Sequence, residues 1–246
     1  MLPDWPVPDP VQAVITLRSM GSSQHPYEHF NLATHVGDNL QQVEINRMLL
    51  RQQLGLQAEP LWLNQVHGTE VIYAGDSNAL LTADGCYSDS VNQACVVLTA
   101  DCLPVLLCNQ QGTKVAAVHA GWRGLCGGIV RNALNRFDSD DTILAYLGPA
   151  ISAKQFEVRS EVLDRFLSSA TTDEHKRQIQ MSFVKTGNDH YLADLYALAK
   201  AELQSCRVDK VYGGNLCSYS QPQQFYSYRR DKDCGRNASL IWLKSS

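Results

Sequence analysis

Three side chains that could bind a metal or act as nucleophile and base stand at the ends of apolar segments. They are His67, Cys102 and His119. Each segment has the length of a strand and is rich in apolar residues, so we expect each side chain to emerge where a buried strand gives way to a loop. Such positions commonly carry binding groups. The three segments are residues 61–67 (LWLNQVH), 96–102 (VVLTADC) and 114–119 (KVAAVH).

Two imidazoles and one thiolate form a ligand set that suits a transition metal, above all zinc. Three protein ligands leave the fourth coordination position free for water or substrate, which is typical of a catalytic site. The spacing matches no short metal-binding motif, because the three residues are far apart in the sequence. Buried cysteines often act as small hydrophobic residues, and histidines often satisfy a backbone group, so a structural interpretation stays open at this point.

The elements that position these residues alternate between strand-like and helix-like patterns, which favours an α/β or α+β fold. No linker or repeat divides the chain, and we interpret residues 1–246 as a single domain. The least hydrophobic region, residues 168–180, is predicted to be a surface loop. Further strands are expected at 13–17, 143–149, 210–212 and 239–243, and helices from Asp38 or Asn39 to Leu54, after Gly124 to Phe137, at 160–167 and at 192–203.

Composition indicates an ordinary globular protein. The 246 residues are 44% hydrophobic and carry a formal net charge of −4, which gives no general reason to expect a nucleic acid or an anionic membrane as partner. No apolar stretch approaches the roughly 18 residues of a membrane span. The first residues lack the features of a secretory signal, so we predict a cytoplasmic protein whose eight cysteines are reduced thiols.

Several longer motifs resemble those of one known family, the laccase-domain proteins, also called the YfiH-type or polyphenol oxidase family. Weaker matches at residues 31–38 and 235–236 extend the resemblance over nearly the whole chain. The sequence departs from the family pattern at residues 19–23 and at Cys234, which leaves the shape of nearby loops open. The motifs are residues 64–68 (NQVHG), 99–107 (TADCLPVLL), 117–125 (AVHAGWRGL), 147–151 (LGPAI) and 225–231 (FYSYRRD).

The resemblance implies that His67, Cys102 and His119 bind zinc together and serve as the catalytic centre. It implies an α+β fold with mixed β-sheets packed together and helices outside, in α/β/β/α layers similar to the catalytic domain of cytotoxic necrotizing factors. It also implies a purine nucleoside phosphorylase that splits adenosine, inosine, guanosine or methylthioadenosine with phosphate, and that deaminates adenosine.

Two other functions remain open. The likeness to cytotoxic necrotizing factors implies that Cys102 could be a nucleophile with His119 as its base. The resemblance also implies a possible amidase or editing hydrolase of cell-wall peptide precursors, which either this Cys–His pair or a zinc-bound water could support. A copper-dependent polyphenol oxidase is the activity that named the family. Multicopper oxidases need many histidines, whereas this chain has seven and commits two of them to one mononuclear site, so copper is the less favoured metal.

Phosphorolysis requires a phosphate clamp, and arginine suits this role through bidentate hydrogen bonds. We predict that Arg18 and Arg229 bind phosphate or substrate, ahead of Arg123, Arg230 and Arg236. Asn31 and Gln65 are predicted to contact substrate, although such amides often only hold a loop. Asn64 and His35 have the same ambiguity. Asp84 either contacts substrate or forms a turn before Gly85, and Asp101 is interpreted as a structural partner.

Overall fold

The computed structural model describes residues 1–75 and 81–245, and its largest element is a six-stranded mixed sheet. Its spatial order is β13-β9-β7-β8-β5-β3. The outer pairs β13·β9 and β3·β5 are parallel, whereas the central pairs are antiparallel. The strands are β3 (Val71–Tyr73), β5 (Gly85–Ser88), β7 (Leu103–Asn109), β8 (Val115–Ala120), β9 (Ile143–Leu147) and β13 (Lys210–Gly213).

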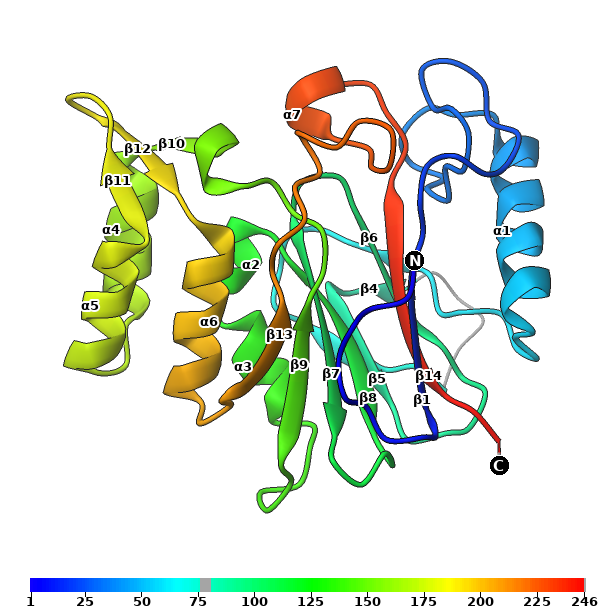
Figure 1. Ribbon diagram of the computed structural model, residues 1–246, viewed down its shortest axis with the longest axis horizontal. Helices are drawn as coiled ribbons and strands as arrows, with labels where there is room; N and C mark the ends of the chain where they lie inside the picture. Colours follow the sequence, from blue (N-terminus) through cyan, green and yellow to red (C-terminus); the bar gives the residue numbers. More distant parts are fainter. Residues whose placement is uncertain (76–80, 246) are drawn as a thin grey trace.

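A second, antiparallel sheet packs against one face of the first (Figure 1). It contains β1 (Val11–Ile15), β14 (Asn237–Leu243) and β6 (Cys95–Thr99), with β14 in the middle. The other described strands form two smaller sheets. They are β2 (Leu63–Asn64) with β4 (Leu81–Thr82), and β10 (Glu157–Arg159) with β12 (His190–Ala193) and β11 (Phe183–Lys185).

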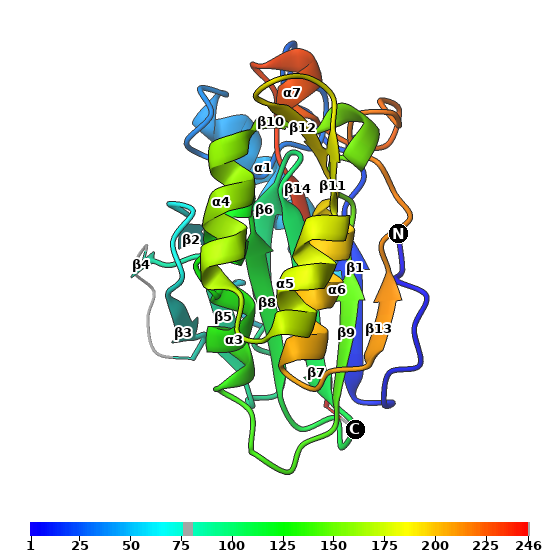
Figure 2. The same ribbon diagram turned by 90° about the vertical axis from the view of Figure 1, so that its left-hand side faces the viewer.

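Helices cover both outer faces of this two-sheet sandwich (Figures 1 and 2). Helix α1 (Leu40–Leu54) lies outside the three-stranded sheet, and α2 (Trp122–Cys126), α3 (Ile129–Leu134) and α6 (Leu195–Ser205) lie on the far face of the six-stranded sheet. Helices α4 (Ser160–Ser169) and α5 (Asp173–Met181) lie beyond them. A 3₁₀ turn, η1 (Ala153–Gln155), and the short α7 (Tyr228–Asp231) lie near the upper end of the sheets.

The layers follow from the two-residue period of the strands. In β8, Val115 and Ala117 face the three-stranded sheet, whereas Ala116 and Val118 face the helices. In β6, Val97 likewise faces the first sheet and its neighbours face α1. Because both sheets are covered on two faces, the strands β6, β7, β8 and β14 are buried along their whole length rather than on alternate residues.

The structure confirms the predicted α+β class with mixed sheets and outer helices. The predicted cap of the first helix is also confirmed, since the Asn39 side chain accepts hydrogen bonds from the amides of Gln41 and Gln42. Among the described residues, no helix is long and apolar enough to span a bilayer.

Several predicted boundaries are wrong. The helix predicted after Gly124 to Phe137 is divided into α2 and α3, because the chain between them turns at Gly128, whose φ is +89°. The strand predicted at 13–17 lies at Val11–Ile15. Residues 168–180 are not a loop, because α5 occupies most of this region, with Thr172 as its cap and Asp173 in its first turn. The predicted helix at 192–203 begins only at Leu195, because residues up to Ala193 pair with β10 and β11 and Asp194 caps the helix.

Candidate metal centre and pocket

His119 occupies the end of β8, and the fold fixes the orientation of its imidazole. Its Nδ1 lies 2.8 Å from Oδ1 of Asp84, which immediately precedes the neighbouring strand β5. The Asp84 side chain is fully buried, and that of His119 is 4% exposed. A carboxylate that binds one ring nitrogen directs the other nitrogen to the opposite side, as in many metal-binding histidines. The Nε2 of His119 is therefore presented to the pocket.

The same carboxylate holds the loop that carries His67. Asp84 accepts hydrogen bonds from the amides of Val66 (3.1 Å), His67 (2.9 Å) and Gly68 (2.6 Å). His67 itself has a φ of +60°, a left-handed conformation that a non-glycine residue adopts only when its surroundings require it. One buried carboxylate thus orients two of the three candidate ligands.

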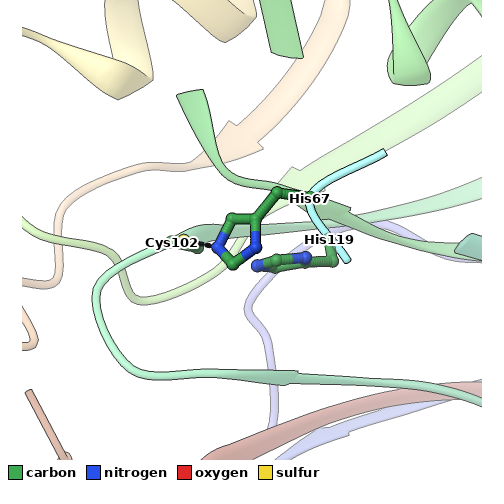
Figure 3. A group of neighbouring side chains, drawn as sticks. All are labelled: His67, Cys102 and His119. Carbon is green, nitrogen blue, oxygen red and sulfur yellow. Dashed lines mark hydrogen bonds between the residues drawn. The ribbon is translucent and has the colours of Figure 1, made fainter. Parts of the chain in front are cut away.

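Cys102 lies in the turn between β6 and β7, opposite the two histidines (Figure 3). Its Sγ lies 3.7 Å from Nε2 of His67, and the imidazole centroids of His67 and His119 are 4.8 Å apart. The candidate ligand atoms of the three residues all lie within 4.8 Å of one another. Residues from three separate segments therefore converge on one point, as the sequence predicts.

The three side chains also influence one another's protonation. Burial alone would raise the pKa of the Cys102 thiol, but the attraction of His119 and hydrogen bonds from both imidazoles lower it to about 6. Burial alone would lower the pKa of His119, and the contacts with Cys102 and Asp84 raise it instead. Burial would likewise raise the pKa of Asp84, but His119 and the loop amides lower it. The cluster therefore favours a thiolate, the form of cysteine that binds metals.

The space between the three ligands is kept open by a glycine. A Cβ atom at Gly121 would lie 2.9 Å from Sγ of Cys102, 2.9 Å from Cδ2 of His67 and 3.6 Å from Nε2 of His119. The donor set of two nitrogens and one sulfur suits zinc, and the opening beside Gly121 leaves room for an ion. The residues present therefore fit a single bound metal ion.

The metal centre forms one side of a pocket of about 400 Å³. Its wall combines aromatic and apolar side chains with a set of polar and charged ones, which is typical of a small-molecule site. Asp101 and Gln65 also lie in the wall. The aromatic walls are Trp122, Phe156 and Tyr228, and the apolar ones include Leu98, Ile151 and Leu195.

Two guanidinium groups line the pocket without a carboxylate partner. Arg229 donates from Nη1 to the carbonyl of Gln155 (2.9 Å), and Arg236 donates from Nη1 to the carbonyls of Cys234 (2.8 Å) and Gly235 (3.0 Å). Within residues 1–75 and 81–245, no carboxylate oxygen lies within 4.0 Å of either group. Neutral carbonyls leave the positive charge uncompensated, so both groups are available to an anion.

Two of the predicted substrate residues, Arg18 and Asn31, lie elsewhere, whereas His35 is part of the pocket wall. Arg18 does not line the pocket, and it is engaged by Glu28 (3.5 Å) and Asp231 (3.9 Å). Asn31 is fully buried and also outside the pocket wall. Its Oδ1 accepts from the amides of Ala33 and Arg236, and its Nδ2 donates to Ala33 and to a carboxylate. Both residues hold loops in the structure.

Gln65 does line the pocket, but its amide is bound to the backbone of β6. Its Nε2 donates to the carbonyl of Leu98, and its Oε1 accepts from the Leu98 amide, both at 2.8 Å. Sequence reasoning missed Phe156, Tyr228 and the organising role of Asp84. Tyr228 lies within a quoted family motif, and Asp84 lies before Gly85, but neither position carries a pattern that indicates its contacts.

Comparisons with known proteins agree with the fold and the resemblance. Over 245 residues the chain is 45% identical to "Purine nucleoside phosphorylase YfiH" of Shigella flexneri and 44% identical to the protein of that name from Escherichia coli. Each alignment covers 99% of this chain and 98% of the relative.

Solved structures show the same fold. The crystal structure of Neisseria meningitidis protein NMB0706 matches with a TM-score of 0.93 and 44% identity, covering 100% of this chain and 99% of that chain. The structure of YlmD from Geobacillus stearothermophilus matches with a TM-score of 0.87 and 26% identity, covering 96% and 93% of the two chains. Residues 12–244 match the family described as multi-copper polyphenol oxidoreductase laccase, and the chain belongs to this family, which its YfiH-type motifs also indicate.

Proposed function

We propose that this protein is a zinc-dependent purine nucleoside phosphorylase acting on adenosine. The observation that carries the proposal is a three-donor metal centre on the wall of a pocket that also holds two uncompensated guanidinium groups. Relatives with 42–45% identity over nearly their whole length carry the name purine nucleoside phosphorylase. The pocket combines the aromatic walls that a purine favours with cations that suit phosphate.

In this proposal His67, Cys102 and His119 hold the zinc ion, and Asp84 keeps the two imidazoles in place. The bound ion would supply Lewis acidity at the reacting end of the pocket. Arg229 and Arg236 would bind inorganic phosphate through charge-assisted hydrogen bonds.

Phosphorolysis breaks the glycosidic C–N bond and forms a C–O bond between phosphate and the anomeric carbon of the ribose. The walls formed by Trp122, Phe156 and Tyr228 would orient the purine and exclude water from this carbon. The guanidinium groups would place a phosphate oxygen against it. Positioning of this kind is the main contribution that these side chains can make.

We propose that the same pocket also accepts inosine, guanosine and methylthioadenosine, which share the purine ring that its aromatic walls would hold. Deamination of adenosine to inosine and ammonia, with water as co-reactant, is the accompanying activity that we propose. Gln65 would contact the substrate from the pocket wall, where its amide also binds Leu98.

Copper chemistry is the alternative that the family's description suggests. The described residues contain one cluster of at least three potential metal ligands, His67, Cys102 and His119. Oxidation of phenols by a multicopper enzyme requires several copper ions in electronic contact, and one three-donor cluster cannot supply them. Zinc is therefore the metal that we propose.

The test is a product assay on protein of measured metal content. Adenosine is incubated with and without phosphate, using the wild type, Cys102→Ala and the matched control Cys206→Ala, whose half-buried thiol lies outside the pocket wall. We expect phosphate-dependent adenine and ribose 1-phosphate from the wild type and the control. Loss of both zinc and products in Cys102→Ala would support the proposal. Zinc-loaded wild type that leaves adenosine, inosine and guanosine intact with phosphate would overturn it.

A further inference from the structure

Asp101, the residue before Cys102, has an unusual backbone conformation. Its φ is +92°, a value that non-glycine residues rarely adopt. Such a conformation is strained and persists only where surrounding contacts enforce it. At Asp101, hydrogen bonds to both carboxylate oxygens hold this conformation.

The Asp101 carboxylate joins two segments that are distant in the sequence. Its Oδ1 accepts a hydrogen bond from Oγ of Ser218 (2.7 Å), and its Oδ2 accepts one from the backbone amide of Arg229 (2.6 Å). Its main-chain carbonyl accepts from the amide of Ile151 (2.9 Å). The segments of Ile151 and Arg229, both of which line the pocket, and the segment of Ser218 therefore meet at Asp101.

The contact with Arg229 anchors a very short helix. Helix α7 has four residues, and the hydroxyl of Ser227 satisfies the amide of Arg230. The amide of Arg229 has no partner within such a short helix, and Asp101 provides one from another part of the chain. A four-residue helix has little stability of its own, so this external hydrogen bond fixes where it lies.

The Arg229 side chain depends on that anchor. Its Nη1 and Nη2 donate to the carbonyls of Gln155 (2.9 Å) and Glu157 (3.4 Å), and its side chain extends along the pocket wall. Arg229 is exposed, and its remaining N–H donors have no protein partner in the described part of the chain. If α7 moved, the guanidinium would lose both carbonyls and its place in the pocket.

We propose that Asp101 is a positioning residue that holds Arg229, through α7, in the orientation that binds the anionic substrate. This inference rests on the proposed function for the identity of that anion, inorganic phosphate. Both carboxylate oxygens are already bonded, so Asp101 acts through Arg229 and not on the reacting atoms.

Three substitutions of Asp101 distinguish the loss of its hydrogen bonds to Ser218 and Arg229, called the anchor below, from the relief of its backbone strain. Asp101→Asn keeps both contacts, because its carbonyl can accept from Arg229 and its NH₂ can donate to Ser218, and asparagine tolerates a positive φ. Asp101→Gly removes the anchor and relieves the strain. Asp101→Ala removes the anchor and keeps the strain. Asp140→Gly, at an exposed position away from the pocket, is the matched control.

The kinetic readout is a double-mutant cycle between Asp101→Gly and Arg229→Ala. We expect Asp101→Gly to raise KM for phosphate about 10-fold or more, with a smaller change in kcat, and Asp101→Asn to restore a value near that of the wild type. The double variant should equal Arg229→Ala alone, because the two residues act through one guanidinium. Additive losses, or an Asn variant as impaired as the Gly variant, would overturn the proposal.

A second readout does not depend on turnover. Hydrogen–deuterium exchange in residues 228–231 should accelerate in Asp101→Gly and Asp101→Ala but not in Asp101→Asn or the control, while the zinc content stays unchanged. Unchanged exchange in the Gly variant would overturn the proposal. If the wild type failed to cleave nucleosides, the proposed function would fall, and the exchange experiment would still decide whether Asp101 holds α7.

Discussion

The two ends of the pocket are built in different ways. At the metal end, the Asp84 side chain is fully buried, the His119 side chain is 4% exposed, and both lie at strand ends in the central sheet. At the anion end, Tyr228 is 52% exposed and Arg229 belongs to a four-residue helix held by backbone carbonyls and one distant carboxylate. At the metal end His119 is therefore held by buried groups of the central sheet, whereas the anion end depends on a few hydrogen bonds at the surface. Substitutions at the metal end should accordingly lower metal binding, whereas substitutions at the anion end should raise KM for phosphate.

The largest effect is expected at Gly121. The added methyl of Gly121→Ala would occupy the space between the three ligands, so we expect metal content and activity to fall together by about 100-fold or more. The fold should persist, since the φ of Gly121 is −61°, which alanine readily adopts. Metal analysis and circular dichroism check this, with Gly187→Ala as control because its Cβ would meet only His190 at 3.7 Å. A Gly121→Ala protein with full zinc would contradict the proposed metal centre.

Asp84→Asn should weaken the metal end without emptying it. The amide cannot accept all the hydrogen bonds that the carboxylate receives from His119 and the 66–68 loop, so we expect metal affinity to fall about 10–100-fold. The free energy of unfolding should also fall by about 1–3 kcal/mol, because a buried donor loses its partner. Zinc competition titrations and chemical denaturation measure the two effects, and exposed Asp140→Asn serves as control. If affinity were unchanged, Asp84 would not be the residue that organises the site.

At the anion end we expect Arg236→Gln to raise KM for phosphate about 10-fold while the zinc content remains unchanged, because a charge-assisted contact is lost and the ligands are untouched. Steady-state kinetics with varied phosphate measure this. Arg177→Gln is the control, since that guanidinium pairs with Glu174 on the surface of α5. Equal losses in the two variants would point to a general charge effect instead of a phosphate subsite.

The smallest effect is expected at Tyr228, an exposed wall of the pocket. Its ring centroid lies 5.9 Å from Cζ of Arg236, a contact worth about 0.5–1 kcal/mol at an exposed site. Tyr228→Leu should therefore raise KM for adenosine or phosphate about 2–5-fold, and Tyr228→Phe, which keeps the ring, should behave as the wild type. If Tyr228→Phe were as impaired as Tyr228→Leu, the hydroxyl of Tyr228 rather than its ring would be the group that contributes to binding.

The metal end could be predicted from the sequence because its ligands stand at the ends of long apolar runs. Those runs become β6 and β8 and carry Cys102 and His119 toward the same place. The role of Asp84 could not be predicted, since its partners at residues 66–68 and 119 meet it only after β3, β5 and β8 have paired. A carboxylate before a glycine is equally typical of a simple turn.

The residues of the anion end are harder to predict, because a sequence does not show which arginines are paired with a carboxylate in the fold. The sequence favours Arg18 over Arg236 as a phosphate-binding residue. In the structure Glu28 and Asp231 pair with Arg18 outside the pocket wall, whereas Arg236 lines the pocket and lacks such partners. Helix α5 is likewise not predicted from the sequence, because its position depends on tertiary contacts. It buries only His175 and Ile179, so its sequence carries almost no apolar pattern, and its packing is decided by its neighbours.

The amide of Gln65 has a consequence for the solubility of the protein. Strand β6 lies at the edge of its sheet, and an open edge is a template on which chains can pair and aggregate. Gln65 caps both polar groups of Leu98 on that edge, and Leu61 bridges to Cys95 farther along. Gln65→Ala should therefore increase light scattering during refolding. We therefore expect the segment that leads to His67 to protect this edge from pairing with another chain.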